Sequence, residues 1–197
     1  MKKLAPFLSL LILLVASCTA EPIQSEPNSL EIVPESLFMS GELNGFPYAN
    51  LKPLAYLDAS SSQTTLETYV TPLTSHKYLV LQGTDMSLNG SASTESILIN
   101  IRIPESQWAV GIYELKDDVS FPMNGLNSCV SLVEAGAGNK TKSLSGTIVI
   151  TEFDPIGKRI KGNFSFTYFR ENDTFLEQPL TFNNGAFNYK LDDPYFN

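Results

Sequence analysis

The residues that most often carry out chemistry in proteins are scarce in this chain of 197 residues, which has one histidine and two cysteines. A catalytic serine or cysteine needs a base beside it, and the single histidine, His76, has no Gly-x-Ser-x-Gly motif near it. Zinc sites need several clustered His or Cys ligands. We therefore expect neither a nucleophilic active site nor a transition-metal site, and we place His76 at a solvated strand edge beside Lys77.

Acidic residues could supply two other kinds of site. The pairs Asp117-Asp118 and Asp192-Asp193 offer oxygen ligands, but neither has the spacing of a calcium-binding loop. The segment 134–141 (EAGAGNKT) has glutamate where a phosphate-binding loop requires its first glycine, so we expect a glycine-rich loop there. A hydrolase that uses two carboxylates stays open, because the sequence does not give the distance between two acids.

The N-terminus has the three-part order of a secretory signal. Two lysines precede an apolar run over residues 4–15, and two small residues then stand before Cys18. The apolar run is shorter than the roughly 20 residues that a membrane-spanning helix needs. This order predicts a signal peptide over residues 1–17.

The end of that signal, Val15-Ala16-Ser17-Cys18, resembles the bacterial lipobox, in which an aliphatic residue and two small residues precede a cysteine. The resemblance implies that Cys18 is the lipid attachment site, that cleavage occurs before it, and that fatty acyl chains such as palmitate are added. Two or three acyl chains anchor a protein firmly, whereas one binds a membrane only marginally. We therefore expect a lipoprotein of the bacterial outer membrane, with its domain on the periplasmic or the surface face. The alternative is an ordinary secretory peptide with a cysteine nearby.

A lipid on Cys18 leaves the second cysteine, Cys129, without a disulfide partner. Cys129 lies in a β-like stretch and has no local histidine or basic cluster that would favour the thiolate. Free cysteine is among the most buried residue types. We expect Cys129 to be a buried, unreactive residue.

Charge and composition limit the partners and the number of domains. Removing residues 1–17 takes away two lysines and no acid, so the net charge falls from −8 to −10. Nucleic-acid binding depends on Lys and Arg that neutralise phosphates, so we expect no nucleic-acid partner. Residues 18–35 hold three prolines and no aromatic residue, which predicts a tether. Residues 36–197 fit a single domain.

Residues with period-two alternation predict that this domain is all-β. Residues 96–103 place four isoleucines on one face, and residues 161–169 (KGNFSFTYF) place Gly162 and three aromatic rings on one side. Further predicted strands are residues 37–43, 54–58, 64–70, 77–82, 110–115, 129–133, 146–153 and a last segment at 187–190. Asn-Gly pairs at 44, 89, 124 and 184, and the segment 154–157 (DPIG), predict tight turns. We predict an antiparallel β-sandwich or partly open barrel of about ten short strands.

Several of these segments resemble a group of uncharacterised Bacteroidota cell-envelope lipoproteins with a β-rich domain. The resemblance is carried by residues 145–154, 160–166 and 180–188, and upstream by residues 43–49 and 111–115. These motifs consist of turn glycines and alternating aromatic residues. They imply a compact β-fold and an envelope setting, and they bring no catalytic residue.

Aromatic residues outside the strongest strand patterns are the remaining candidate ligand contacts. They are Tyr48, Tyr56, Tyr69, Tyr78 and Trp108. Aromatic rings stack on sugars, but they also dominate the cores of β-proteins. We expect a non-enzymatic binding or accessory module without a cofactor or metal. The alternatives are a glycan-binding module that uses these aromatics, a component that pairs with another envelope protein through an edge strand, and a carboxylate-based hydrolase.

Overall fold

The computed structural model describes residues 38–53, 64–70, 75–85, 96–117, 125–134, 141–170 and 179–191, and only the backbone at 66–70, 117, 141–144 and 170. Several predictions made from the sequence lie outside these residues: the signal peptide 1–17, Cys18, the tether 18–35, the strand 54–58, Tyr56, Asp118, Asp192, Asp193 and the glycine-rich loop at 135–140.

The described residues form ten strands and one short 3-10 helix, all within one compact unit, Val33–Asn197. The elements are β1 (Met39–Leu43), β2 (Phe46–Leu51), β3 (Thr64–Val70), β4 (Ser75–Thr84), β5 (Ile97–Pro104), η1 (Glu105–Gln107), β6 (Gly111–Asp117), β7 (Ser128–Glu134), β8 (Thr141–Asp154), β9 (Arg159–Arg170) and β10 (Leu180–Lys190). The all-β prediction is confirmed. Within the described part of the chain, no helix is long and apolar enough to cross a membrane.

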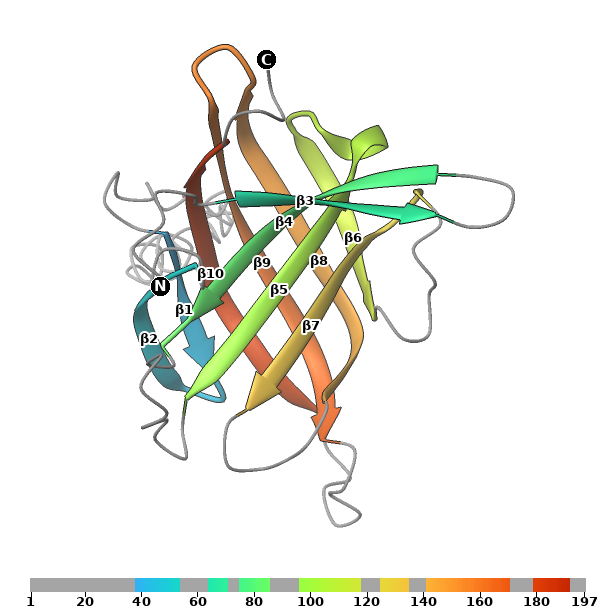
Figure 1. Ribbon diagram of the computed structural model, residues 1–197. Coiled ribbons are helices and arrows are strands. Elements are labelled where there is room, and N and C mark those ends of the chain that lie inside the picture. The colour runs from blue at the N-terminus through green and yellow to red at the C-terminus, as the bar shows by residue number, and fades with distance from the viewer. Residues whose placement is uncertain are drawn as a thin grey trace, which may run out of the picture. The chain divides into compact units, whose positions relative to one another are not determined.

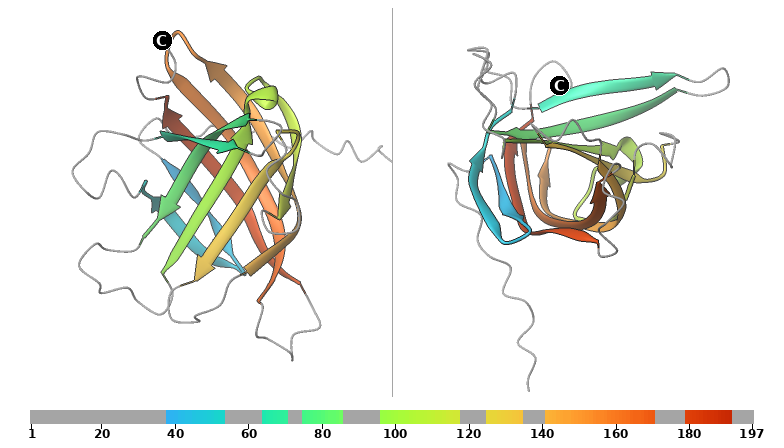
Figure 2. Two further views of the ribbon diagram at one scale, coloured as in Figure 1. Left: turned by 45° about the vertical axis from the view of Figure 1, so that its right-hand side comes forward. Right: turned by 90° about the horizontal axis from the view of Figure 1, so that it is seen from below.

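The ten strands make a single sheet in the order β2-β1-β10-β9-β8-β6-β7-β5-β4-β3, which curls into a partly open barrel (Figures 1 and 2). Every neighbouring pair is antiparallel except β6 and β7, which run parallel through Leu115↔Ser128. The sheet is therefore mixed, because β6 inserts between β7 and β8. The sandwich and the barrel were both predicted, and the curled single sheet corresponds to the barrel.

The curl brings β4 against the opposite end of the sheet. The backbones of Lys52 and Thr84 exchange two hydrogen bonds, of 2.8 and 2.9 Å. The phenol of Tyr189 in β10 donates to the backbone carbonyl of Gln82 in β4. A Cβ atom at Gly83 would lie 2.5 Å from the sulfur of Met39 in β1 and 3.0 Å from Cβ of Leu51 in β2, so the strands approach closely at this glycine.

Side chains that alternate towards the inside of the curl form one continuous core. The four isoleucines of β5 are fully buried, as predicted, while Asn100 and Arg102 point the other way. In β9, Phe164 and Phe166 face inward, and both rings stack on Phe182 of β10 at centroid distances of 5.2 and 5.3 Å. These stacked rings fix the relative positions of β9 and β10.

Two predicted turns are confirmed, and both use residues that tolerate unusual backbone angles. Asn44 and Gly45 have φ values of 51° and 82° and join β1 to β2. The β8–β9 hairpin begins at Asp154, whose carboxylate accepts the N–H groups of Ile156 and Gly157. Lys158, with φ of 54°, takes the left-handed position of this turn.

Two features of the fold differ from the sequence predictions. The pair Asn184-Gly185 is not a turn between strands, because it lies inside β10 at an irregularity of the ladder with β9 between Phe182 and Gly185. Strand β2, with Pro47 near its start, was not predicted as a strand. Proline is tolerated there because β2 lies at an edge of the sheet.

Candidate functional site

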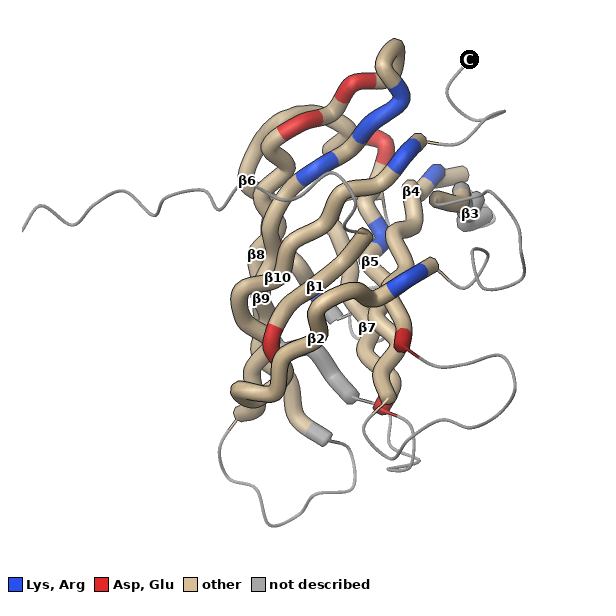
Figure 3. The backbone as a smooth tube through the Cα atoms, turned by 90° about the vertical axis from the view of Figure 1, so that its left-hand side faces the viewer, with Lys and Arg blue, Asp and Glu red and all other residues tan. Residues whose placement is uncertain are grey.

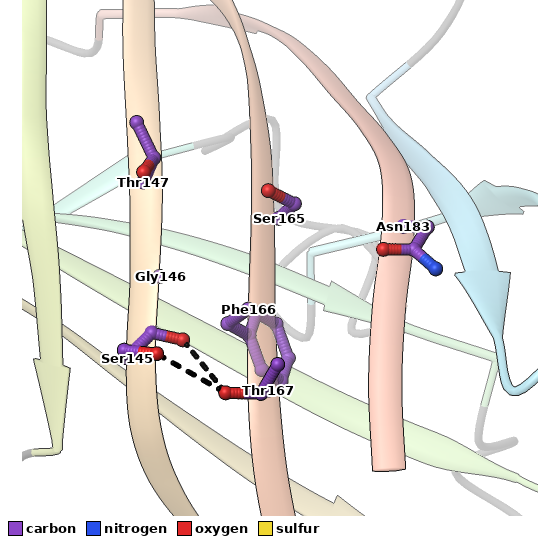
Figure 4. A pocket seen from close by; sticks show the side chains of 7 residues that line it. All are labelled: Ser145, Gly146, Thr147, Ser165, Phe166, Thr167 and Asn183. Atoms are coloured by element: carbon purple, nitrogen blue, oxygen red, sulfur yellow. Dashed lines mark hydrogen bonds between the residues drawn. The ribbon is translucent and has the colours of Figure 1, made fainter. Parts of the chain in front are cut away.

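A shallow hollow of about 240 Å³ lies over three adjacent strands, β8, β9 and β10 (Figure 4). The residues that line it are Ser145, Gly146, Thr147, Ser165, Phe166, Thr167 and Asn183. All seven come from the C-terminal third of the chain, and none is charged.

Strand alternation places the polar members of this set on the outer face of the sheet. In β8, Ile148 is buried whereas Ser145 and Thr147 are exposed. In β9, Phe166 is buried whereas Ser165 is exposed. A shallow depression follows because these outward positions carry short hydroxyl side chains.

The floor of the hollow is held by close contact between β8 and β9. A Cβ atom at Gly146 would lie 2.6 Å from the carbonyl oxygen of Ser165 and 2.7 Å from Cβ of Phe166. No larger residue fits there without a shift of backbone, so Gly146 keeps the two strands close. Phe166 is in turn fixed by its stacking on Phe182.

The irregularity of β10 forms the third side of the hollow. The register of β10 shifts between Phe182 and Gly185, and Asn184 takes a left-handed φ of 53°. A bulge of this kind changes the direction of neighbouring side chains. Asn183 is exposed at the rim, where its amide nitrogen donates to the hydroxyl of Thr181 across 3.1 Å.

The hydroxyl groups in the hollow differ in their hydrogen bonding. Ser145 Oγ and Thr167 Oγ1 lie 3.2 Å apart, and Thr167 also donates to the backbone carbonyl of Ser145 (Figure 4). Thr147 and Ser165 lie directly opposite each other on β8 and β9. No hydrogen bond joins either of their hydroxyls to another described residue, so both can donate to and accept from a ligand.

Among the residues of β8 and β9 whose side chains are described, the charged ones lie towards the shared hairpin (Figure 3). There, Lys161 Nζ lies 3.3 Å from Glu152 Oε2. The nearest charge by register is Glu114 of β6, opposite Thr147, and its carboxylate is paired with Lys116 at 2.6 Å. The residues that line the hollow are thus neutral, with the Glu114–Lys116 pair beside them on β6.

The predicted ligand-contacting aromatics lie elsewhere and make contacts within the protein. Tyr48 is 7% exposed and packs edge-on against Phe46. Tyr78 is buried, its hydroxyl accepts the N–H of Gly125 across 2.7 Å, and burial raises its pKa.

Trp108 is half-buried and packs at the edge of the core. Its indole donates to the carbonyl of Ile103 across 3.0 Å, and its ring stacks on Phe153 with centroids 6.3 Å apart. Tyr69 belongs to β3, and its side chain lies outside the described atoms. Tyr48 and Tyr78 therefore offer no exposed ring face, and Trp108 offers only part of one.

The remaining candidates for chemistry are separated from the hollow. Cys129 is a free cysteine and is 1% exposed, as expected. His76 differs from the expectation of a solvated position, because it is half-buried with its ring against Gly125. Among the described residues, no group of three or more His, Cys, Asp or Glu side chains could hold a metal ion.

The residues of the hollow were not predicted as a site from the sequence, although the sequence does show short polar residues at alternate positions of these strands. The outward positions of β9 read Asn163, Ser165 and Thr167, and those of β8 include Ser145 and Thr147. Short hydroxyl side chains on the solvent face of two strands are ordinary. Only the pairing of β8 with β9 and the bulge of β10 bring them around one depression.

Comparisons with known proteins do not identify a family or a function for this chain. No family model, curated protein or solved structure significantly matches the chain.

Proposed function

We propose that this chain is a lipid-anchored binding module of the bacterial envelope, in which the curled sheet displays the hollow on β8–β10 as its ligand site. The anchor is supported by the sequence Val15-Ala16-Ser17-Cys18, which precedes a proline-containing stretch and then the β-domain. An anchored module with a preformed surface site fits capture of a ligand close to the membrane.

The observation that carries the proposal is the chemistry of the hollow. Its lining combines hydroxyl and amide groups from three adjacent strands, two of which, β9 and β10, are packed together by stacked core rings. These groups form hydrogen bonds but are poor general acids or bases near neutral pH. Such a set supports binding without catalysis at this place.

The binding part of the proposal is tested by filling the hollow. Ser165→Tyr places a large side chain in it, and Thr151→Tyr, at another exposed position of β8, is the matched control. The probes are neutral hexasaccharides and seven-residue peptides, and the measurement is the amide chemical shifts of the mature lipoprotein in detergent. We expect a probe to shift Thr147, Ser165 and Asn183 in the native protein and in the control only. If no probe shifts these amides, the hollow is not the ligand site.

The anchor is tested separately with Cys18→Ser in a bacterial host. We expect the native protein in the membrane fraction, with an acylated Cys18 at its N-terminus by mass spectrometry, and the variant without lipid. Native protein that stays water-soluble and is cleaved at another position would contradict the envelope anchor.

A further inference from the structure

We propose that the ligand of the hollow is a neutral sugar residue of a glycan, an inference that rests on the proposed function. The ligand class follows from three properties of the site: its lack of charge, the unused hydrogen-bonding capacity of its hydroxyls, and its position in the middle of the sheet.

The lack of charge disfavours ionic ligands. No lysine or arginine lines the hollow to pair with a phosphate or carboxylate, and no acid lines it to pair with an amine. Residues 145–151 and 162–169, which form this part of β8 and β9, contain no charged residue at all. A neutral ligand loses no ionic hydration when it enters such a site.

The hydrogen-bonding groups match adjacent hydroxyls of a sugar ring. The hydroxyls of Thr147 and Ser165 stand side by side, and each can donate one hydrogen bond and accept others. Asn183, whose amide nitrogen already donates to Thr181, keeps its carbonyl oxygen as an acceptor. A sugar hydroxyl likewise both donates and accepts, so neighbouring hydroxyls can satisfy all three groups.

The position of the hollow disfavours recognition of an extended peptide through its backbone. Peptides that add a strand to a sheet need an edge with free N–H and C=O groups. Here β9 is paired with β8 on one side and with β10 on the other, apart from the irregularity of β10 between Phe182 and Gly185, so no strand edge is open along the hollow. Recognition therefore relies mainly on side chains. The volume of about 240 Å³ is below the usual range for drug-sized ligands, which favours a single ring.

The test titrates the mature lipoprotein, in detergent, with maltohexaose, mannohexaose, chitohexaose and oligogalacturonate, and with the seven-residue peptides. Variants Thr147→Val and Ser165→Ala remove one hydroxyl each, and Thr151→Val is the control. We expect at least one neutral oligosaccharide to shift Thr147, Ser165 and Asn183. Each hydroxyl deletion should weaken its binding by about threefold to tenfold, the effect of one lost hydrogen bond, with no effect of the control.

The outcomes separate this inference from the proposed function. If peptides but no sugars shift the three amides, the sugar inference is wrong and the binding site stands. Preference for oligogalacturonate over every neutral sugar also overturns it. If nothing shifts these amides, the inference and the proposed site both fail. Sugar binding that survives both hydroxyl deletions unchanged places the contact elsewhere and contradicts the inference.

Discussion

The side-chain amide of Asn44 donates a 2.9 Å hydrogen bond to the phenol oxygen of Tyr168, which joins the β1–β2 turn to β9 across 124 positions of sequence. The other end of the same side chain accepts the N–H of Thr181 at 2.9 Å, and the Asn44 backbone N–H donates to the Thr181 carbonyl. Asn44 thus connects the β1–β2 turn to two strands, β9 and β10, from a position with a left-handed φ of 51°.

We predict that Asn44→Ala destabilises the domain by about 2–4 kcal/mol. The change leaves the Thr181 N–H and the Tyr168 hydroxyl without this partner, and it forces alanine into a left-handed conformation. Urea unfolding should show a lower midpoint with an unchanged slope.

Asn44→Gly separates the two contributions. Glycine adopts the left-handed conformation without strain, so this variant loses only the side-chain hydrogen bonds. We expect it to lie between the native protein and Asn44→Ala in stability. Equal stability of the two variants would show that the backbone angle contributes nothing.

Gly162 of β9 is predicted to be the least replaceable glycine of the core. A Cβ atom there would overlap the carbonyl oxygen of Val149 and would lie 2.5 Å from the ring of Phe187. We expect Gly162→Ala to cost about 2–4 kcal/mol, because both the β8–β9 ladder and a buried ring must move. The measurement is the unfolding midpoint in urea.

Gly45→Ala is the control for that substitution. A Cβ atom at Gly45 would meet no other atom within 4 Å, but the φ of this residue is +82°. Its replacement should therefore cost only the backbone strain, about 1–2 kcal/mol. If Gly162→Ala costs no more than Gly45→Ala, the close packing at Gly162 is not a determinant of stability.

Alternation was sufficient to predict most strands, because one face of the sheet is buried and the other is not. The isoleucines of β5 and the aromatics of β9 carry that pattern without interruption. Strand β2 could not be found in this way, because its burial repeats every third residue, at Tyr48 and Leu51. The parallel pairing of β6 with β7 depends on contacts between distant segments, which local patterns do not contain.

The candidate site could not be predicted from the sequence, because it also depends on which distant strands become neighbours. Asn184-Gly185 carries the composition of a tight turn, and in the fold the same conformational freedom serves a bulge inside β10. Tyr48 and Tyr78, two of the aromatic residues predicted to contact a ligand, are buried and pack within the domain. Ligand-facing groups on a sheet surface are recognisable only when the neighbours of each strand are known.

We predict that Tyr189 makes the stability of the domain sensitive to alkaline pH. Its ring is buried and its hydroxyl donates to Gln82 in β4, and burial raises its pKa well above the ordinary value of 10.0. The folded state therefore keeps the proton at pH values where the unfolded chain releases it. The stabilisation is fully present below about pH 10 and is lost as the pH rises above that value.

We predict that Tyr189→Phe lowers the stability of the domain at neutral pH and raises it, relative to the native protein, at strongly alkaline pH. At pH 7 the variant should be less stable by about 1 kcal/mol, because the hydrogen bond to Gln82 is lost. Above pH 10 the native protein should lose stability faster than the variant. Parallel stability curves across pH 8–11 in chemical unfolding would show that Tyr189 ionises freely in the folded state.

Counting the reactive thiols of the protein before and after unfolding tests both the burial of Cys129 and the proposed lipid on Cys18. The native fold buries Cys129 to 1% exposure, so a thiol reagent such as Ellman's reagent should find no reactive group in the mature protein before unfolding. In guanidinium we expect it to find one thiol, because the lipid proposed for Cys18 would convert that thiol into an unreactive thioether. Cys129→Ser should then give none. Two reactive thiols in the unsubstituted protein after denaturation would show that Cys18 carries no lipid. One reactive thiol before denaturation would show that β7 opens readily enough to expose Cys129.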